Sequence, residues 1–117
     1  MPVIKTRIDR SSDDFDKNRE TNVSLASDLR ALNESVMRGG SHRAREKHLS
    51  RGKLLPRDRI KVLADADSPF LEIGRLAGHE VYADDVPCAG IITGIVRIHG
   101  IECMVVANDA TVKGGTY

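Results

Sequence analysis

The feature that most constrains the fold is a pair of apolar runs that are separated by only two residues. Residues 91–98 and 101–107 flank His99 and Gly100, and both runs are rich in Ile and Val. A two-residue connection in which Gly supplies positive φ is typical of a β-hairpin. Residues 105–107 are apolar on consecutive positions, so we expect both faces of the second strand to be covered. The hairpin must therefore lie against other elements.

A helix is predicted well before the hairpin. Four apolar residues recur at intervals of three and four, namely Leu25, Leu29, Leu32 and Val36. This spacing predicts one face of a helix over about residues 22–37. Thr21 or Asn22 can cap its start, and Gly39-Gly40 can end it. We expect the narrow apolar face to lie on the core, with a partner helix as the alternative.

Shorter elements fill the middle of the chain. Ser41 can cap a polar second helix over about residues 42–50, and Pro56 is suited to the first position of a third helix that reaches Leu63. Residues 70–73 predict a short strand, and residues 74–89 predict a loop.

The order of the elements predicts an α/β fold in which helices precede strands. We divide the chain into a polar N-terminal arm over residues 1–20, a basic helical segment over 21–65, and the start of a β core over 66–117. A hairpin with one further strand leaves strand edges and apolar faces open. Since 117 residues allow one domain at most, we expect this sequence to be a piece of a larger protein.

Charge is distributed unevenly. Residues 1–61 carry 15 Lys and Arg against 9 Asp and Glu, a net +6, and residues 62–117 carry 3 against 8, a net −5. Nine of the basic residues fall between Arg38 and Lys61. Such density favours a solvated helix face, an anionic cofactor or another subunit. Nucleic acid is disfavoured, because no aromatic residues are interleaved to stack on bases.

Composition excludes other classes of protein. Hydrophobic residues make up 40% and charged residues 30%, as in a globular chain rather than a disordered one. No apolar run approaches the roughly 20 residues that cross a bilayer, so no membrane association is expected. Cys88 and Cys103 are too few for a disulfide framework, and residues 1–15 do not resemble a signal peptide. A reduced intracellular compartment is the simplest expectation.

No catalytic or metal-binding motif is found. The four histidines are scattered, at His42, His48, His79 and His99. None has the spacing of metal ligands, and solvation is the expected state of all four. Cys103 is expected to be a small buried apolar residue. Gly90 and Gly94 do not form a dinucleotide-binding motif, and a bulge or close backbone packing explains them better.

One short segment is a candidate binding site, formed by Thr111, Val112, Lys113, Gly114 and Gly115. It follows a predicted buried strand at a place where a helix is expected to start. Backbone N–H groups in that geometry can meet a phosphate, a thioester or an oxyanion. Lys113 adds a cation. The segment lacks the spacing of a P-loop, which argues against a nucleoside triphosphate.

Five stretches together resemble the β subunits of biotin-dependent acyl-CoA carboxylases. They are RAREKH at 43–48, RGKLLPRDRI at 51–60, SPFLEI at 68–73, GIITGI at 90–95 and VVANDATVKGGTY at 105–117. Order and spacing agree over about residues 21–117. The last stretch is most similar to the 3-methylcrotonyl-CoA branch of the family, and the geranyl-CoA and propionyl-CoA branches are the alternatives.

The resemblance implies an incomplete crotonase-like N-terminal carboxyltransferase domain. It implies transfer of a carboxyl group from carboxybiotin to 3-methylcrotonyl-CoA, in leucine degradation. The biotin would be carried by a biotin carboxylase and biotin carrier α subunit, and a CoA thioester would be the substrate. The family's oxyanion-binding glycine pairs lie in later segments, so the resemblance implies no catalytic residue and no metal in this chain, which is expected to be inactive alone.

The resemblance also suggests what this segment does. Residues 111–115 would line the CoA channel, through backbone contacts from Val112 to Gly115 and a polar contact from Lys113. The basic helices would pack on the domain exterior or on a neighbouring subunit. Further expected partners are the remainder of the subunit and a β-subunit oligomer, in a bacterial cytoplasm or, alternatively, a mitochondrial matrix. A binding or assembly module that uses residues 38–61 is the alternative function.

Overall fold

The fold is described from a computed structural model that covers residues 3–115. The described residues leave out Met1, Pro2, Thr116 and Tyr117. The predicted arm over residues 1–20 therefore lacks its first two residues in this description, and the predicted β core and the 105–117 stretch lack their last two. The chain divides into two compact units between Leu32 and Asn33. No helix among residues 3–115 is long and apolar enough to cross a membrane.

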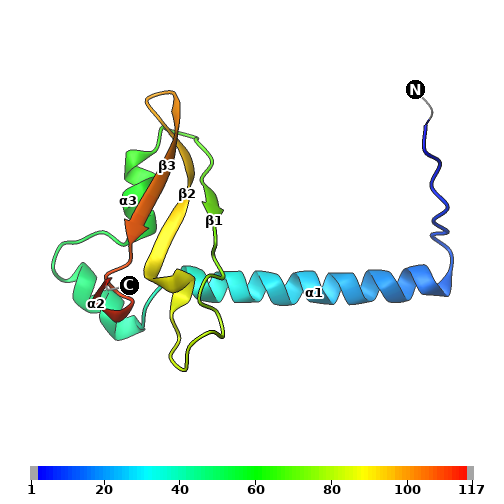
Figure 1. The fold of residues 1–117 in the computed structure, drawn as a ribbon, viewed down its shortest axis with the longest axis horizontal. Helices are drawn as coiled ribbons and strands as arrows, with labels where there is room; N and C mark the ends of the chain where they lie inside the picture. Colours follow the sequence, from blue (N-terminus) through cyan, green and yellow to red (C-terminus); the bar gives the residue numbers. More distant parts are fainter. Residues whose placement is uncertain (1–2, 116–117) are drawn as a thin grey trace. The chain divides into compact units, whose positions relative to one another are not determined.

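Helix α1 (Asp13–Met37) is the longest element (Figure 1). It ends where the sequence predicts, but it begins at Asp13 instead of near Asn22. The Ser12 hydroxyl accepts a hydrogen bond from the backbone N–H of Phe15 at 3.2 Å and so caps the helix. Aspartates in the first turn complement the positive end of the helix dipole.

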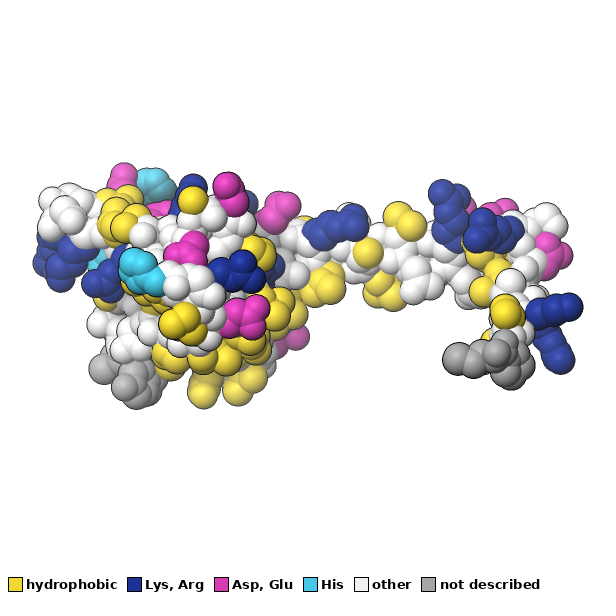
Figure 2. Space-filling model, turned by 90° about the horizontal axis from the view of Figure 1, so that it is seen from above, with side chains coloured by type: hydrophobic (Ala, Val, Ile, Leu, Met, Phe, Trp, Pro, Cys, Tyr) yellow, Lys and Arg dark blue, Asp and Glu magenta, His cyan; other side chains and the backbone are white. Residues whose placement is uncertain are grey.

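The apolar face of α1 is largely uncovered among the described residues. Leu25 is 62% exposed and Leu29 is 49% exposed, and only Val36 is buried. Apolar side chains are visible along this helix in the space-filling view (Figure 2). Val36 belongs to residues 33–117, so core contact is confirmed for this C-terminal end of the face. For Leu25 and Leu29, contact with the core stays a prediction.

Two short helices follow at the predicted places. Helix α2 (His42–Leu49) is capped by Ser41, whose hydroxyl accepts from the N–H of Ala44 at 3.3 Å. Helix α3 (Pro56–Leu63) has Pro56 in its first turn and buries Ile60. Helix α2 buries none of its residues, as its polar sequence predicts.

The three strands form one antiparallel sheet in the order β1-β2-β3 (Figure 1). They are β1 (Leu71–Ile73), β2 (Ile91–Ile98) and β3 (Ile101–Asn108). The predicted hairpin is confirmed, with Ile98 paired to Ile101. His99 and Gly100 both have positive φ, at 50° and 79°, as the two central residues of a type I′ turn require.

Gly94 lets β1 approach β2 closely. It pairs with Glu72, and a Cβ at position 94 would collide with the carbonyl oxygen of Leu71 and the ring of Phe70. Close backbone packing, one of the two interpretations of this glycine from sequence, is confirmed.

The two faces of the sheet differ. Ile92 and Val96 on one face are each 1% exposed, and α3 packs against β2 and β3. Leu71, Met104 and Val106 on the other face are between 61% and 66% exposed. The expectation that both faces of β3 are covered is therefore wrong within residues 3–115, because these residues supply only one layer of helix.

The loop after α3 holds the hairpin turn. The Asp65 carboxylate accepts hydrogen bonds from the N–H of His99 at 2.6 Å and from the N–H of Gly100 at 2.7 Å. The Gly100 N–H, together with that of His99, holds the pKa of Asp65 below its usual range. The N–H of Asp65 donates to the carbonyl oxygen of Arg97 at 2.9 Å. This loop therefore fixes the far end of β2.

Candidate functional site

The candidate segment forms a tight turn directly after β3. The N–H of Asp109 donates to the carbonyl oxygen of Gly90 at 2.8 Å, which anchors the entry to the turn. The N–H of Val112 donates to the carbonyl of Asp109 at 3.0 Å, and that of Gly115 donates to the carbonyl of Val112 at 2.8 Å. The N–H groups of Val112 and Gly115 are therefore already used inside the turn.

Burial divides the segment into an inner and an outer part. Thr111 and Val112 are 6% and 3% exposed, whereas Lys113 and Gly114 are exposed and Gly115 is half-buried. Lys113, Gly114 and Gly115 all have positive φ, at 44°, 74° and 83°, in the left-handed region that favours glycine. Only these last three residues can meet a ligand with much of their surface.

A buried carboxylate shapes the inner part. Asp109 is 2% exposed, and its Oδ1 accepts from the N–H of Thr111 at 2.9 Å and from the Thr111 hydroxyl at 2.6 Å. The same hydroxyl oxygen accepts from the N–H of Gly40 at 3.0 Å. Residues 109–111 are thereby joined to the Gly39-Gly40 turn that follows α1.

Lys113 forms an ion pair on the surface of the turn. Its Nζ lies 2.5 Å from Oδ2 of Asp84, with the two side chains 51% and 72% exposed. Lys113 lowers the pKa of Asp84 through this hydrogen bond and its charge. The sequence predicts the cation but not its partner, which comes from the loop between β1 and β2.

Arg57 links three segments of the chain through its guanidinium group. Its Nε and Nη2 donate to the two carboxylate oxygens of Glu72 at 3.0 Å and 2.5 Å, and its Nη1 donates to the carbonyl of Met37 at 2.8 Å. The Glu72 side chain is only 2% exposed. Burial by itself lowers the pKa of Arg57. The hydrogen bonds to Glu72 and Cys88 raise this pKa by more than burial lowers it, so the pKa of Arg57 lies above its usual value.

The two cysteines differ in their surroundings. Cys88 is buried 3.3 Å from Nη2 of Arg57, and burial raises the pKa of its thiol although Arg57 partly opposes the shift. Cys103 is partly exposed, so the expectation that it is buried is wrong. Cys88, Ala89 and Gly90 all have positive φ. Nothing in the sequence of the loop predicts that left-handed turn.

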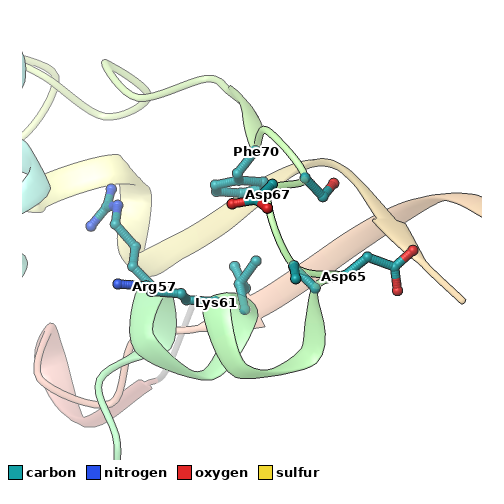
Figure 3. A pocket seen from close by; sticks show the side chains of 9 residues that line it. Arg57, Lys61, Asp65, Asp67 and Phe70 are labelled. Carbon is teal, nitrogen blue, oxygen red and sulfur yellow. The ribbon is translucent and has the colours of Figure 1, made fainter. Parts of the chain in front are cut away.

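A pocket of about 470 Å³ lies elsewhere, between α3 and the loop over residues 65–70. Arg57 and Lys61 line one side and Phe70 the other, while the carboxylate of Asp65 points away from it (Figure 3). None of its lining residues belongs to the 111–115 segment. No group of three or more His, Cys, Asp or Glu among residues 3–115 could hold a metal ion.

Residues 47–117 match the carboxyl transferase domain family. A relative described as a probable mitochondrial methylcrotonoyl-CoA carboxylase beta chain, from Drosophila melanogaster, is 50% identical over 98% of this chain and 20% of its own length. The biotin-dependent 3-methylcrotonyl-coenzyme A carboxylase beta1 subunit of Mycobacterium tuberculosis is 62% identical over 68% of this chain and 15% of its own length.

Solved structures of related subunits are also similar to this chain. The β subunit of P. aeruginosa geranyl-CoA carboxylase superposes with a TM-score of 0.82 at 38% identity, covering 98% of this chain and 21% of that one. The structure of transcarboxylase 12S, which is described as a hexamer assembly, superposes with a TM-score of 0.71 at 31% identity, covering 78% of this chain and 19% of that one.

The chain spans about a fifth of the length of the relatives it matches. Over that part, the predicted fold class is confirmed: helices followed by strands, as at the start of a crotonase-like carboxyltransferase domain. Because residues 47–117 match this family and the backbone superposes on that of a related β subunit, this chain belongs to the carboxyl transferase domain family, together with the β subunits of biotin-dependent acyl-CoA carboxylases.

Proposed function

We propose that this chain forms the beginning of the carboxyltransferase subunit of a biotin-dependent acyl-CoA carboxylase, and that it binds the CoA part of the substrate. The complete enzyme would transfer a carboxyl group from carboxybiotin to 3-methylcrotonyl-CoA. The observation that carries the proposal is the turn after β3, in which Lys113 and Gly114 are exposed and Gly115 is half-buried. The names of the relatives support the choice of acyl chain.

The outer residues of the turn have distinct roles in this proposal. Lys113 attracts a phosphate of CoA, and Gly114 lets that group approach the backbone because it has no side chain and open space around it. The N–H groups of Val112 and Gly115 are engaged within the turn. Val112 and Gly115 therefore contribute shape, together with Thr111, and not new hydrogen-bond donors.

Biotin does not fit the described part of this turn. An oxyanion on its ureido ring would need a pair of preorganised backbone donors, and three of the five N–H groups of residues 111–115, those of Thr111, Val112 and Gly115, already have acceptors. The exposed Lys113 and Gly114 are assigned to CoA in this proposal. We therefore assign no catalytic residue and no step involving biotin to this chain. The biotin would be delivered by an α subunit that carries it.

The proposed partners are that α subunit, the remainder of this subunit and further β subunits. The exposed sheet face and the exposed face of α1 leave apolar surface for such contacts. The transcarboxylase relative is described as a hexamer. We propose a bacterial cytoplasmic location, or a mitochondrial matrix location as for the relatives named mitochondrial.

The test uses the complete carboxylase, meaning the full β subunit that carries this sequence assembled with its biotin-carrying α subunit. Lys113→Ala should raise KM for 3-methylcrotonyl-CoA about tenfold, as expected for a lost charge-assisted contact, with a smaller change in kcat. Lys17→Ala on α1 is the matched control and should leave both constants unchanged. An unchanged KM for Lys113→Ala would contradict the proposal.

Two further measurements sharpen this test. Asp84→Asn removes the partner of Lys113 but keeps the cation, so KM should stay level or fall. A rise like that of Lys113→Ala would mean that the ion pair, and not the cation, matters. Rates with 3-methylcrotonyl-CoA, geranyl-CoA and propionyl-CoA decide the acyl chain, and we expect the first to be the fastest.

The basic segment over residues 38–61 supports a second candidate function, contact with another subunit. Helix α2 buries none of its residues, and a helix of this kind gains stability from charged neighbours. Arg43→Ala with Lys47→Ala in the complete carboxylase should then weaken the oligomer in light scattering while KM stays unchanged. An intact oligomer would exclude this role for α2.

A further inference from the structure

We propose that Thr111 is a positioning residue, which sets the place of Lys113 by joining the turn after β3 to the Gly39-Gly40 turn after α1. This inference rests on the proposed binding of CoA at residues 111–115. In this inference, Thr111 does not contact the substrate. Its hydroxyl connects two segments that are 71 residues apart in the chain.

The Thr111 hydroxyl makes one hydrogen bond as a donor and one as an acceptor within the protein. It donates to Oδ1 of Asp109 at 2.6 Å and accepts from the N–H of Gly40 at 3.0 Å. Thr111 is 6% exposed and Asp109 is 2% exposed, so water does not compete readily for these bonds. The only hydroxyl proton is therefore donated inside the protein and is not available to a ligand.

The Gly39-Gly40 turn fits this arrangement because it has no side chains. A Cβ at Gly39 would lie 2.5 Å from Oδ2 of Asp109, and Gly39 has a φ of 74° that favours glycine. A Cβ at Gly40 would collide with the backbone carbonyl of Thr111. Gly40 is therefore in direct contact with the backbone of Thr111, and a side chain at position 40 would displace the turn after β3.

The Gly39-Gly40 turn is itself fixed in place. Nη1 of Arg57 donates to the carbonyl of Met37 at 2.8 Å, and the N–H of Gly39 donates to the carbonyl of Val36 at 3.1 Å. On the other side, the carbonyl of Gly90 holds the N–H of Asp109. Lys113 follows Thr111 by two residues, so its backbone position is set before any ligand binds. A site that is preorganised in this way loses less entropy on binding.

The inference predicts a specific pattern among variants of the complete carboxylase. Thr111→Val keeps the shape of the side chain but leaves the Gly40 N–H without its acceptor, so the turn should shift. KM for the acyl-CoA should rise about tenfold, with a smaller change in kcat. Thr111→Ser keeps the hydroxyl and should stay within about twofold of the parent in KM.

Thr93→Val is the matched control. The Thr93 hydroxyl in β2 also donates a hydrogen bond, to the backbone carbonyl of Ile73 at 2.9 Å, but Thr93 has no part in the turn. Its KM should equal that of the parent. If Thr111→Val and Thr93→Val lower the melting temperature equally and neither changes KM, Thr111 has only a structural role and the inference is overturned.

Hydrogen exchange on the unsubstituted carboxylase tests the inference even if Thr111→Val does not fold. The amides of Gly40 and Thr111 should exchange slowly before acyl-CoA is added and should change little afterwards. Fast exchange that slows only with acyl-CoA would mean that the turn is not preformed. That result would overturn the inference.

The two proposals fail in different ways. If Lys113→Ala raises KM and Thr111→Val does not, residues 111–115 still bind CoA but Thr111 does not position them. If Lys113→Ala leaves KM unchanged, CoA does not bind through Lys113 and the proposed function itself fails, whatever the result for Thr111.

Discussion

Arg57 and Glu72 form a bidentate ion pair that links α3 to β1. Each carboxylate oxygen of Glu72 accepts from a different guanidinium nitrogen, at 3.0 Å and 2.5 Å. The Glu72 side chain is 2% exposed and that of Arg57 is 19% exposed. Because Arg57 also binds the carbonyl of Met37, one side chain joins two helices and a strand. The Gly39-Gly40 turn depends on this arrangement.

Glu72→Gln should destabilise the complete carboxylase markedly. The substitution leaves the buried guanidinium of Arg57 without its counter-charge, and breaking one side of a buried pair costs about 3 kcal/mol or more. The melting temperature of the β subunit should fall accordingly. Glu102→Gln is the control, since Glu102 lies 3.9 Å from Arg97 in an exposed pair that is worth about 1 kcal/mol at most. Equal effects of the two variants would contradict this account.

Asp65 should make the hairpin turn sensitive to acid. Its pKa is lowered in the folded chain, so its stabilising effect is present above the unfolded value of about 4 and is lost as pH falls through the folded pKa. The amide NMR signals of His99 and Gly100 should shift together below about pH 4. Asp65→Asn should abolish that step. A step that persists in Asp65→Asn would assign it to another group.

The two cysteines should differ in their reaction with thiol reagents. Burial raises the pKa of the Cys88 thiol, so little thiolate is present at neutral pH. Cys103 is partly exposed. In the 117-residue chain we expect a maleimide at pH 7 to label Cys103 at least about tenfold faster than Cys88, as followed by mass spectrometry. Labelling of Cys88 at the rate of Cys103 would show that the loop over residues 87–90 opens freely.

The uncovered sheet face should bind an apolar dye in the 117-residue chain. Met104 and Val106 lie two residues apart on β3, on the same face, and are 61% and 66% exposed. Met104→Thr with Val106→Thr keeps β-forming residues and should lower the dye fluorescence. Val81→Thr is the control, because Val81 is equally exposed (68%) but lies in a loop. No change on substitution in β3 would place the dye elsewhere.

The local elements could be predicted from sequence because their signals are local. Pro56 marks the start of α3, and the Ile- and Val-rich runs around Gly100 mark the hairpin. The apolar period does not mark the start of α1, because the first turns of this helix lack apolar residues at helical spacing. The caps were nonetheless present in the sequence, in Ser12 and the acidic residues that follow it.

The contacts between distant segments could not be predicted. The Gly39-Gly40 pair predicts the end of a helix. No sequence pattern around it predicts the contact between Gly40 and Thr111, which lie 71 residues apart. Asp84 as the partner of Lys113 is equally unmarked, because it lies in a long loop without periodicity. The uncovered sheet face also depends on what lies outside residues 3–115, which no local pattern reports.

The most direct test of the central claim is the hydrogen-exchange footprint of the acyl-CoA on the complete carboxylase. If residues 111–115 bind CoA, the amides of Lys113 and Gly114 should become protected when 3-methylcrotonyl-CoA is added, while those of α2 do not change. Protection that appears only outside residues 109–115 would contradict the account.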